Sequence, residues 1–238
     1  ACAMALAQEG VVVTITGRTE TSLVETAQEI EQATGQAVSI AVGDIATETG
    51  QAAALEVCAD PDILVNNAGG PPPGDFRDWD RDDWIKALDA NMLAAIMLTK
   101  AVVDPMAAKG YGRIINVTSA AVKAPIELLG LSNGARAGLT GFMAGLARQV
   151  AMDGVTINNL LPGPFETGRL TSTLTAVSER TGKPLDEVRA ERMALNPTGR
   201  FGDPAEFGAA CAFLASAKAG YINGQNLVLD GGAFKGTL

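Results

Sequence analysis

The sequence contains no histidine and few charged or aromatic side chains. Charged residues make up 19% of the 238 residues and aromatic residues 5%. Without histidine, Ser-His-Asp and Cys-His nucleophile systems and every histidine-ligated metal site are excluded. No compact carboxylate cluster stands at a strand end, so we expect no metal. Because the charged fraction lies below the roughly 25% typical of globular proteins, much of the chain should be buried, in a core or in subunit contacts.

Long apolar runs, basic clusters and paired cysteines are also missing. The net charge of −9 and the pI near 4.6 argue against nucleic-acid binding, which needs clustered Lys and Arg. No apolar run approaches the roughly 18 residues of a membrane span, and no signal peptide is visible. Cys2, Cys58 and Cys211 are widely separated, which suits free thiols in a reducing compartment. We therefore expect a cytoplasmic protein that binds neither nucleic acid nor membrane, and the low charge favours a homo-oligomer, either dimer or tetramer.

What is present is a regular alternation of strand and helix patterns. Short apolar runs, several of them rich in β-branched residues, predict strands, and runs with helical spacing separate them. The expected strands are 11–16, 37–42, 62–66, 113–117, 155–161 and 226–229; the expected helices are 1–8, 21–34, 48–58, 80–109, 130–153 and 203–217, with weaker helices in 169–195. This order predicts an α/β fold: one doubly wound parallel sheet in a single domain over residues 1–238. We expect strand 11–16 to be buried on both faces and helix 80–109 to be interrupted at Pro105.

Polar residues follow the first three expected strands, at the edge where such sheets bind ligands. Arg18 suits the 2′-phosphate of a dinucleotide, although an exposed loop arginine is common. Asp44 could accept a hydrogen bond from an adenine amino group or cap the next helix. The turn Asn67, Ala68 and Gly69 allows a ligand to approach the backbone closely, and its plain alternative is a tight turn.

Two later strands end in the same way. Ser119 closes the strand 113–117, and Pro162 with Gly163 closes the strand 155–161. Asn91 lies in an otherwise apolar helical stretch, where a buried amide needs a partner in the backbone or a bound water. Single residues of these types usually form turns, but several on one sheet edge favour a ligand site.

These motifs together resemble the short-chain dehydrogenase/reductase family, and most closely its bacterial 3-oxoacyl-acyl-carrier-protein reductases. The matching segments, in family order, are NNAG at 66–69, Asn91, IINVTS at 114–119, LLPGPFET at 160–167 and YINGQNLVLDGG at 221–232. The resemblance implies a Rossmann-type sheet, an NADP or NAD cofactor, hydride transfer to a carbonyl of a small-molecule substrate, and a homo-oligomer. It also implies a substrate lid at about 168–197.

The resemblance implies a catalytic set of Asn, Ser, Tyr and Lys, of which only two members are conserved in type. Asn91 and Ser119 match, whereas Ser132 and Arg136 stand where the family has the Tyr and Lys of YxxxK. The segment reads SNGAR instead. The cofactor contacts implied for this chain are Arg18, Asp44, Ile45, Asn67, Ala68, Gly69, Arg136, Pro162, Gly163 and Phe165.

The substitutions leave two hypotheses. A serine hydroxyl is a weaker acid than a phenol and stops short of a carbonyl set for tyrosine, and arginine cannot relay a proton. Loss of a general acid typically costs a factor of roughly 10²–10⁴. The first hypothesis is an NADP(H)-dependent reductase of a carbonyl, such as a 3-oxoacyl thioester; Arg18 favours NADP over NAD. The alternative is a catalytically impaired member that binds nucleotide or serves in an assembly.

The family also begins with a strand and a glycine-rich TGxxxGxG loop, whose helix N-terminus receives the pyrophosphate. Residue 1 falls within the helix that follows this loop, and no similar glycine cluster occurs later. That first strand would be central in the sheet. We therefore expect the 238 residues to leave two interior strand edges unpaired.

Overall fold

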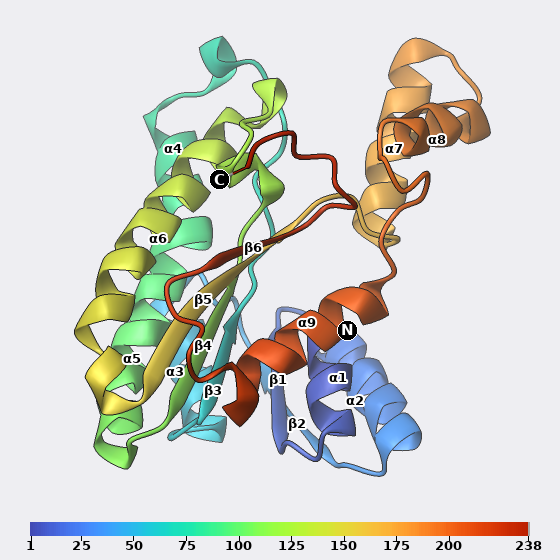
Figure 1. Cartoon of the computed structure of the whole chain (residues 1–238). Coiled ribbons are helices and arrows are strands. Elements are labelled where there is room, and N and C mark those ends of the chain that lie inside the picture. Colours follow the sequence, from blue (N-terminus) through green and yellow to red (C-terminus); the bar gives the residue numbers. More distant parts are fainter. Residues whose placement is uncertain (238) are drawn as a thin grey trace.

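The computed structural model describes residues 1–237 and has the expected α/β architecture, with helices on both faces of parallel strands (Figure 1). The strands are β1 (Val13–Gly17), β2 (Val38–Val42), β3 (Ile63–Asn66), β4 (Gly112–Val117), β5 (Val155–Pro162) and β6 (Asn226–Leu229). The helices are α1 (Cys2–Gln8), α2 (Glu20–Thr34), α3 (Glu48–Val57), α4 (Arg81–Leu88), α5 (Ala94–Lys109), α6 (Gly130–Gln149), α7 (Gly168–Thr181), α8 (Leu185–Ala194) and α9 (Pro204–Ala215). None of the helices described in this range could cross a membrane, given their length and polarity.

The strands form two parallel sheets. One pairs β1 with β2, and the other has the order β3-β4-β5-β6. Within residues 1–237, β1 and β3 share no ladder, so the two unpaired interior edges expected from the sequence are present. A cavity of about 790 Å³ lies between them, lined by 11–16 on one side and 62–66 on the other.

The first strand is less buried than its sequence predicts. We expected 11–16 to be covered on both faces, but Val12 is 85% exposed and Val13 is the one fully buried residue of β1. The expectation was wrong because an edge strand has fewer neighbouring side chains around it than a central strand does. Since β1 pairs only with β2, its other edge faces the cavity.

Side chains rather than strand hydrogen bonds connect the two sheets. One core, on the side of α1 and α9, contains Leu6 and Val13 together with Ile115, Leu160 and Leu214. Helix α1 packs closely against α9, and it also contacts β1. The α1–α9 layer therefore spans both sheets. A second core fills the space between α5, α6 and the opposite face of β4 and β5.

The long helical stretch is interrupted, but not at Pro105. A π turn at Asp89–Leu93 separates α4 from α5, and Pro105 lies inside α5. The expected position was wrong because the proline is on the solvent side, where a helix bends most easily. A π turn has no local sequence signature, although such turns are frequent at functional sites. This one contains Asn91.

Four asparagines form a chain of amides across the larger sheet. Asn66, Asn116, Asn159 and Asn226 are register partners on β3, β4, β5 and β6. Each Nδ2 donates to the Oδ1 of the next, at 2.9, 3.0 and 2.8 Å. At the start of the chain, the buried Oδ1 of Asn66 has no partner among the described residues. The chain of amides thus begins on the strand that borders the cavity.

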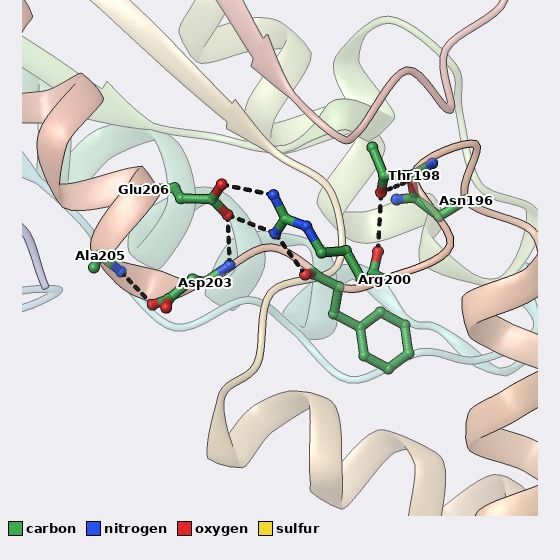
Figure 2. Close-up of polar contacts among 7 residues, drawn as sticks. Asn196, Thr198, Arg200, Asp203, Ala205 and Glu206 are labelled. Atoms are coloured by element: carbon green, nitrogen blue, oxygen red, sulfur yellow. Dashed lines mark hydrogen bonds and ion pairs between the residues drawn. The ribbon is translucent and has the colours of Figure 1, made fainter.

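Helices α7 and α8 form a small unit of their own, upper right in Figure 1, around Leu174, Val188 and Phe201. The segment leading from it to α9 is fixed by polar contacts (Figure 2). Arg200 donates two hydrogen bonds of 2.7 Å to Glu206, whose carboxylate also accepts from the Asp203 backbone. The Arg200 guanidinium and then the Asp203 amide lower the pKa of Glu206 to about 2.

Candidate functional site

The site lies at the carboxyl ends of the strands, where two cavities meet. Ile45, Asn67, Ala68, Asn91 and Arg136 line the cavity of about 790 Å³. These residues follow β2 and β3 or lie on the π turn and α6, so the fold brings together positions far apart in the sequence. Five of the predicted site residues are thus neighbours of a single cavity.

Asn91 lies on the boundary between this cavity and a second one. The second cavity measures about 330 Å³ and is lined by Asn91, Gly70, Trp79, Lys86 and Leu131, among others. Asn91 is 4% exposed, and its Oδ1 has no hydrogen-bond partner in residues 1–237. Because buried amide oxygens are rarely left unpaired, this acceptor is available to a bound water or ligand.

Ser132 and Arg136 are one helical turn apart on α6 and bond to one another. Arg136 Nε donates to Ser132 Oγ at 3.2 Å, and Nη1 donates to the Val117 carbonyl at 2.8 Å. Nη2 donates to the Ala68 carbonyl at 3.4 Å, which links α6 to the turn after β3. Burial, followed by the positive charge of Arg169, lowers the pKa of Arg136 to about 10. The guanidinium therefore stays protonated at neutral pH.

Ser119 caps a short 3₁₀ turn after β4. Its Oγ accepts a hydrogen bond from the Ala121 amide at 3.1 Å, which leaves the hydroxyl proton free to donate. Helix α6 packs against this turn. Neither Ser119 nor Ser132 lines either cavity, but Ser132 accepts a hydrogen bond from Arg136, which lines the larger one.

The residues predicted to contact the adenosine end are exposed after β1 and β2. Arg18 is exposed next to β1. Asp44 Oδ1 accepts a hydrogen bond from the Ala46 amide at 3.0 Å. This contact agrees with the capping role that was one of the two alternatives for Asp44. Ile45 lines the larger cavity and Gly69 the smaller one.

The residues after β5 lie outside both cavity walls. Gly163 packs so closely on Asp230 that a Cβ would stand 2.8 Å from the Asp230 Cα. The ring of Phe165 packs edge-on against Phe207, with 5.3 Å between centroids. Pro162 ends β5. These residues therefore connect β5 with β6 and α9.

Arg169, at the start of α7, was not among the predicted residues. Its guanidinium lies against Gly70: Nη2 is 2.9 Å from where a Cβ on Gly70 would stand. The sequence places an arginine two residues after LLPGPFET, which is a weak indication by itself. Only the tertiary structure brings it to the turn that Arg136 also contacts. Lys86 and Trp79, which line the smaller cavity, were missed for the same reason.

Comparisons with known proteins agree with this geometry. The family described as enoyl-(acyl carrier protein) reductase matches residues 1–233. The chain belongs to the short-chain dehydrogenase/reductase family. The resemblance and the Rossmann-type fold expected from the sequence are both confirmed.

Relatives in this family cover most of the chain. The 3-oxoacyl-(acyl-carrier-protein) reductase FabG of Vibrio cholerae is 39% identical over 175 residues, which is 73% of this chain and 66% of that protein. The chain therefore spans just under two thirds of this relative. The FabG protein of Vibrio harveyi is 34% identical over 223 residues, 86% of each chain. The structure of L-sorbose reductase from Gluconobacter frateurii, complexed with NADPH and L-sorbose, has a TM-score of 0.93 at 28% identity and covers 99% of this chain and 91% of its own.

Proposed function

We propose that this protein is an NADP(H)-dependent oxidoreductase that reduces the carbonyl of a small molecule. The observation that carries the proposal is the meeting of Asn91 and Arg136 at one cavity, at the sheet edge where dinucleotide folds bind ligands. Membership of a reductase family and the NADPH held by the L-sorbose reductase support it. Residues 1–238 form one domain in this proposal, with 168–197 as a substrate lid.

The residues at the strand ends fit a dinucleotide. The unpartnered Asn91 Oδ1 offers an acceptor where the larger cavity reaches the carboxyl ends of the strands, beside Ala68 and Arg136. Arg18 would hold the 2′-phosphate and Arg136 the ribose hydroxyls. The further contacts that we propose are Asp44, Ile45, Asn67, Ala68, Gly69, Pro162, Gly163 and Phe165. When bound, the nicotinamide would supply the hydride.

The hydroxyl groups of two serines take the place of the tyrosine in this proposal. Ser132 Oγ accepts from Arg136, and Ser119 Oγ accepts from a backbone amide, so each hydroxyl proton is free to donate to a carbonyl oxygen. Arg136 stays charged, which polarises the carbonyl without giving up a proton. A water that donates a hydrogen bond to Asn91 Oδ1 would return to Ser132 the proton that Ser132 donates.

The test is steady-state oxidation of NADPH against a panel of carbonyl compounds that includes 3-oxoacyl thioesters. Ser119→Ala and Ser132→Ala should each lower kcat/KM. The serine that donates the proton should show the larger loss, roughly 10²–10⁴-fold. Ser22→Ala, on the exposed side of α2, is the matched control. Turnover that is unaffected by Ser119→Ala would contradict the assigned site.

Two further measurements distinguish a working reductase from a catalytically impaired family member. Saturable NADPH binding without turnover of any carbonyl would contradict the reductase. Activity created from nothing by Ser132→Tyr together with Arg136→Lys would show that the chain keeps a binding site but lacks the proton donor.

We also propose that the protein works as a cytoplasmic homo-oligomer. Helices α5 and α6 expose Met97 by 43% and Phe142 by 42%, which supports subunit contacts on this side of the molecule. Sedimentation of the purified protein measures the oligomeric state, and a monomer at micromolar concentration would contradict this proposal.

A further inference from the structure

Two arginines from different helices meet at one turn of the site. Arg136 on α6 donates to the Ala68 carbonyl, and Arg169 on α7 lies against Gly70, two residues further along the same turn. Gly70 has no Cβ, and the Arg169 guanidinium takes up that space. Gly70 lines the smaller cavity, Arg136 lines the larger one, and Arg169 lines neither, so the turn after β3 brings two positive charges to the border of the two cavities.

Neither guanidinium has an acidic partner in the part of the chain that the structure describes. Arg136 is 8% exposed and bonds only to two carbonyls and Ser132 Oγ, so two of its five N–H donors remain. Arg169 is exposed and makes no side-chain hydrogen bond with residues 1–237, so all five of its donors face water and remain available to a ligand. By contrast, Arg77, Arg189 and Arg200 each pair with a carboxylate.

Burying a positive charge near a second one is unfavourable unless an anion joins them. The buried Arg113 provides a comparison, because it donates to three carbonyl oxygens and lies over the Tyr111 ring, with no second arginine among these contacts. Arg136 differs, since it contacts the same turn as Arg169; burial, and then the charge of Arg169, lower the pKa of Arg136. The chain as a whole has a net charge of −9, so two neighbouring arginines stand out against its acidic composition.

The smaller cavity adds a third positive charge. Lys86 lines it and forms no ion pair within residues 1–237, whereas Asp83, the carboxylate in its wall, accepts from the Asp80 amide in the cap of α4. At about 330 Å³, the cavity suits a small molecule. Asn91, between the two cavities, would lie where the carbonyl meets the cofactor.

We propose that the substrate of this protein carries a free carboxylate, which Arg169 binds at the Ala68–Gly70 turn, while Arg136 adds a second positive charge nearby and keeps its remaining donors for the ribose. The substrate class is then a small oxo acid, and not the thioester that the names of the relatives indicate, because a thioester has no free carboxylate near its carbonyl. Planar guanidinium groups bind carboxylates through two parallel hydrogen bonds. The inference rests on the proposed function for the carbonyl and for the cofactor beside it.

The experiment uses acetoacetate and its methyl ester, which share a carbonyl and differ in the carboxylate. Calorimetry measures the Kd of each, with and without NADP⁺, and NADPH oxidation measures each KM. Arg169→Gln should raise the ratio of the acetoacetate Kd to the methyl acetoacetate Kd by about 10- to 100-fold, the effect of losing a charged hydrogen bond. Arg180→Gln, an exposed arginine on the same helix, is the matched control and should leave the ratio as it is.

Gly70→Ala gives an independent test. The new Cβ would stand 2.9 Å from Arg169 Nη2, so the flexible arginine has to move while the fold is kept. The same rise in the Kd ratio is expected. An unchanged ratio in both variants would overturn the carboxylate site.

Two other outcomes are separable. If Arg169→Gln weakens NADP⁺ binding and leaves the acetoacetate ratio unchanged, the anion is a phosphate of the dinucleotide, and the carboxylate proposal is wrong. If acetoacetate binds selectively but no NADPH is oxidised, the proposed reductase function is wrong, whereas the proposed carboxylate site is supported. Calorimetry does not depend on turnover, so the two failures are distinguishable.

Discussion

Strand β1 of the two-stranded sheet and strand β5 of the four-stranded sheet have similar sequences but very different neighbours. β1 reads VTITG and β5 begins VTIN, yet Val155 to Leu161 of β5 are all buried, whereas β1 has one fully buried residue. β5 has a partner on each edge, and α6 and α9 contact it. β1 has a partner on one edge and a cavity at the other. A β-branched sequence therefore permits a buried strand, but the neighbours decide whether burial follows.

The largest expected effect contrasts a leucine of β5 with the valine that precedes β1. Leu160 is completely buried, so Leu160→Ala should lower the free energy of unfolding by about 2–5 kcal/mol, from lost burial and the resulting void. Val12 is 85% exposed, and Val12→Ala should change that free energy by less than about 0.5 kcal/mol. Urea denaturation measures both. Equal losses would mean that the chain entering β1 is as well enclosed as β5.

The second effect lies within the chain of asparagines. Asn116→Ala removes the amide between Asn66 and Asn159 and should cost about 1–3 kcal/mol, chiefly because Asn159 Oδ1 loses its donor, whereas Asn66 Nδ2 still has Thr99 Oγ1 as an acceptor. Asn66→Ala should cost less, because its Oδ1 already lacks a partner in the described chain. Chemical denaturation of the two variants compares them. A larger loss for Asn66→Ala would show that the cavity-facing end of the chain of amides is its more important part.

The smallest effect tests the helix layer that joins the two sheets. A Cβ on Gly208 would lie 2.6 Å from the Ala1 carbonyl oxygen and 3.1 Å from the Ala5 Cβ, so Gly208→Ala should push α1 away from α9. We expect a loss of about 1–3 kcal/mol from this overpacking, which outweighs the gain in helix propensity.

Gly145→Ala on α6 is the matched control. Nothing stands within 4 Å of its Cβ position, and the substitution should stabilise the helix by about 0.5–1 kcal/mol. Thermal unfolding of both variants gives the sign directly. Stabilisation by Gly208→Ala would contradict a tight α1–α9 contact.

Much of the fold could be predicted from the sequence because local patterns specify strands and helices. The β-branched runs, the glycines after α2 and α7, and the capping residue Asp203 all act within a few residues of chain. The π turn at Asp89–Leu93 could not be predicted in this way. Its sequence is compatible with an ordinary helix, and packing of the turn against α6 accompanies the change.

The candidate site was predictable only in part, for a related reason. Asn91, Ser132 and Arg136 could be proposed from motif spacing, since spacing along the chain is preserved in a family. The approach of Arg169 to Gly70 could not, because it joins the start of α7 to a turn about a hundred residues earlier. The direction of the Ser132–Arg136 hydrogen bond likewise depends on how α6 packs.

The sequence by itself determined the α/β class and the absence of histidine chemistry, because these depend on composition and periodicity. The tertiary structure decided that β1 is half-exposed, that four asparagines bond in a row, and that two arginines share one turn without an acidic partner in the described chain. Such features depend on which distant segments become neighbours, and local interactions along a chain do not specify that.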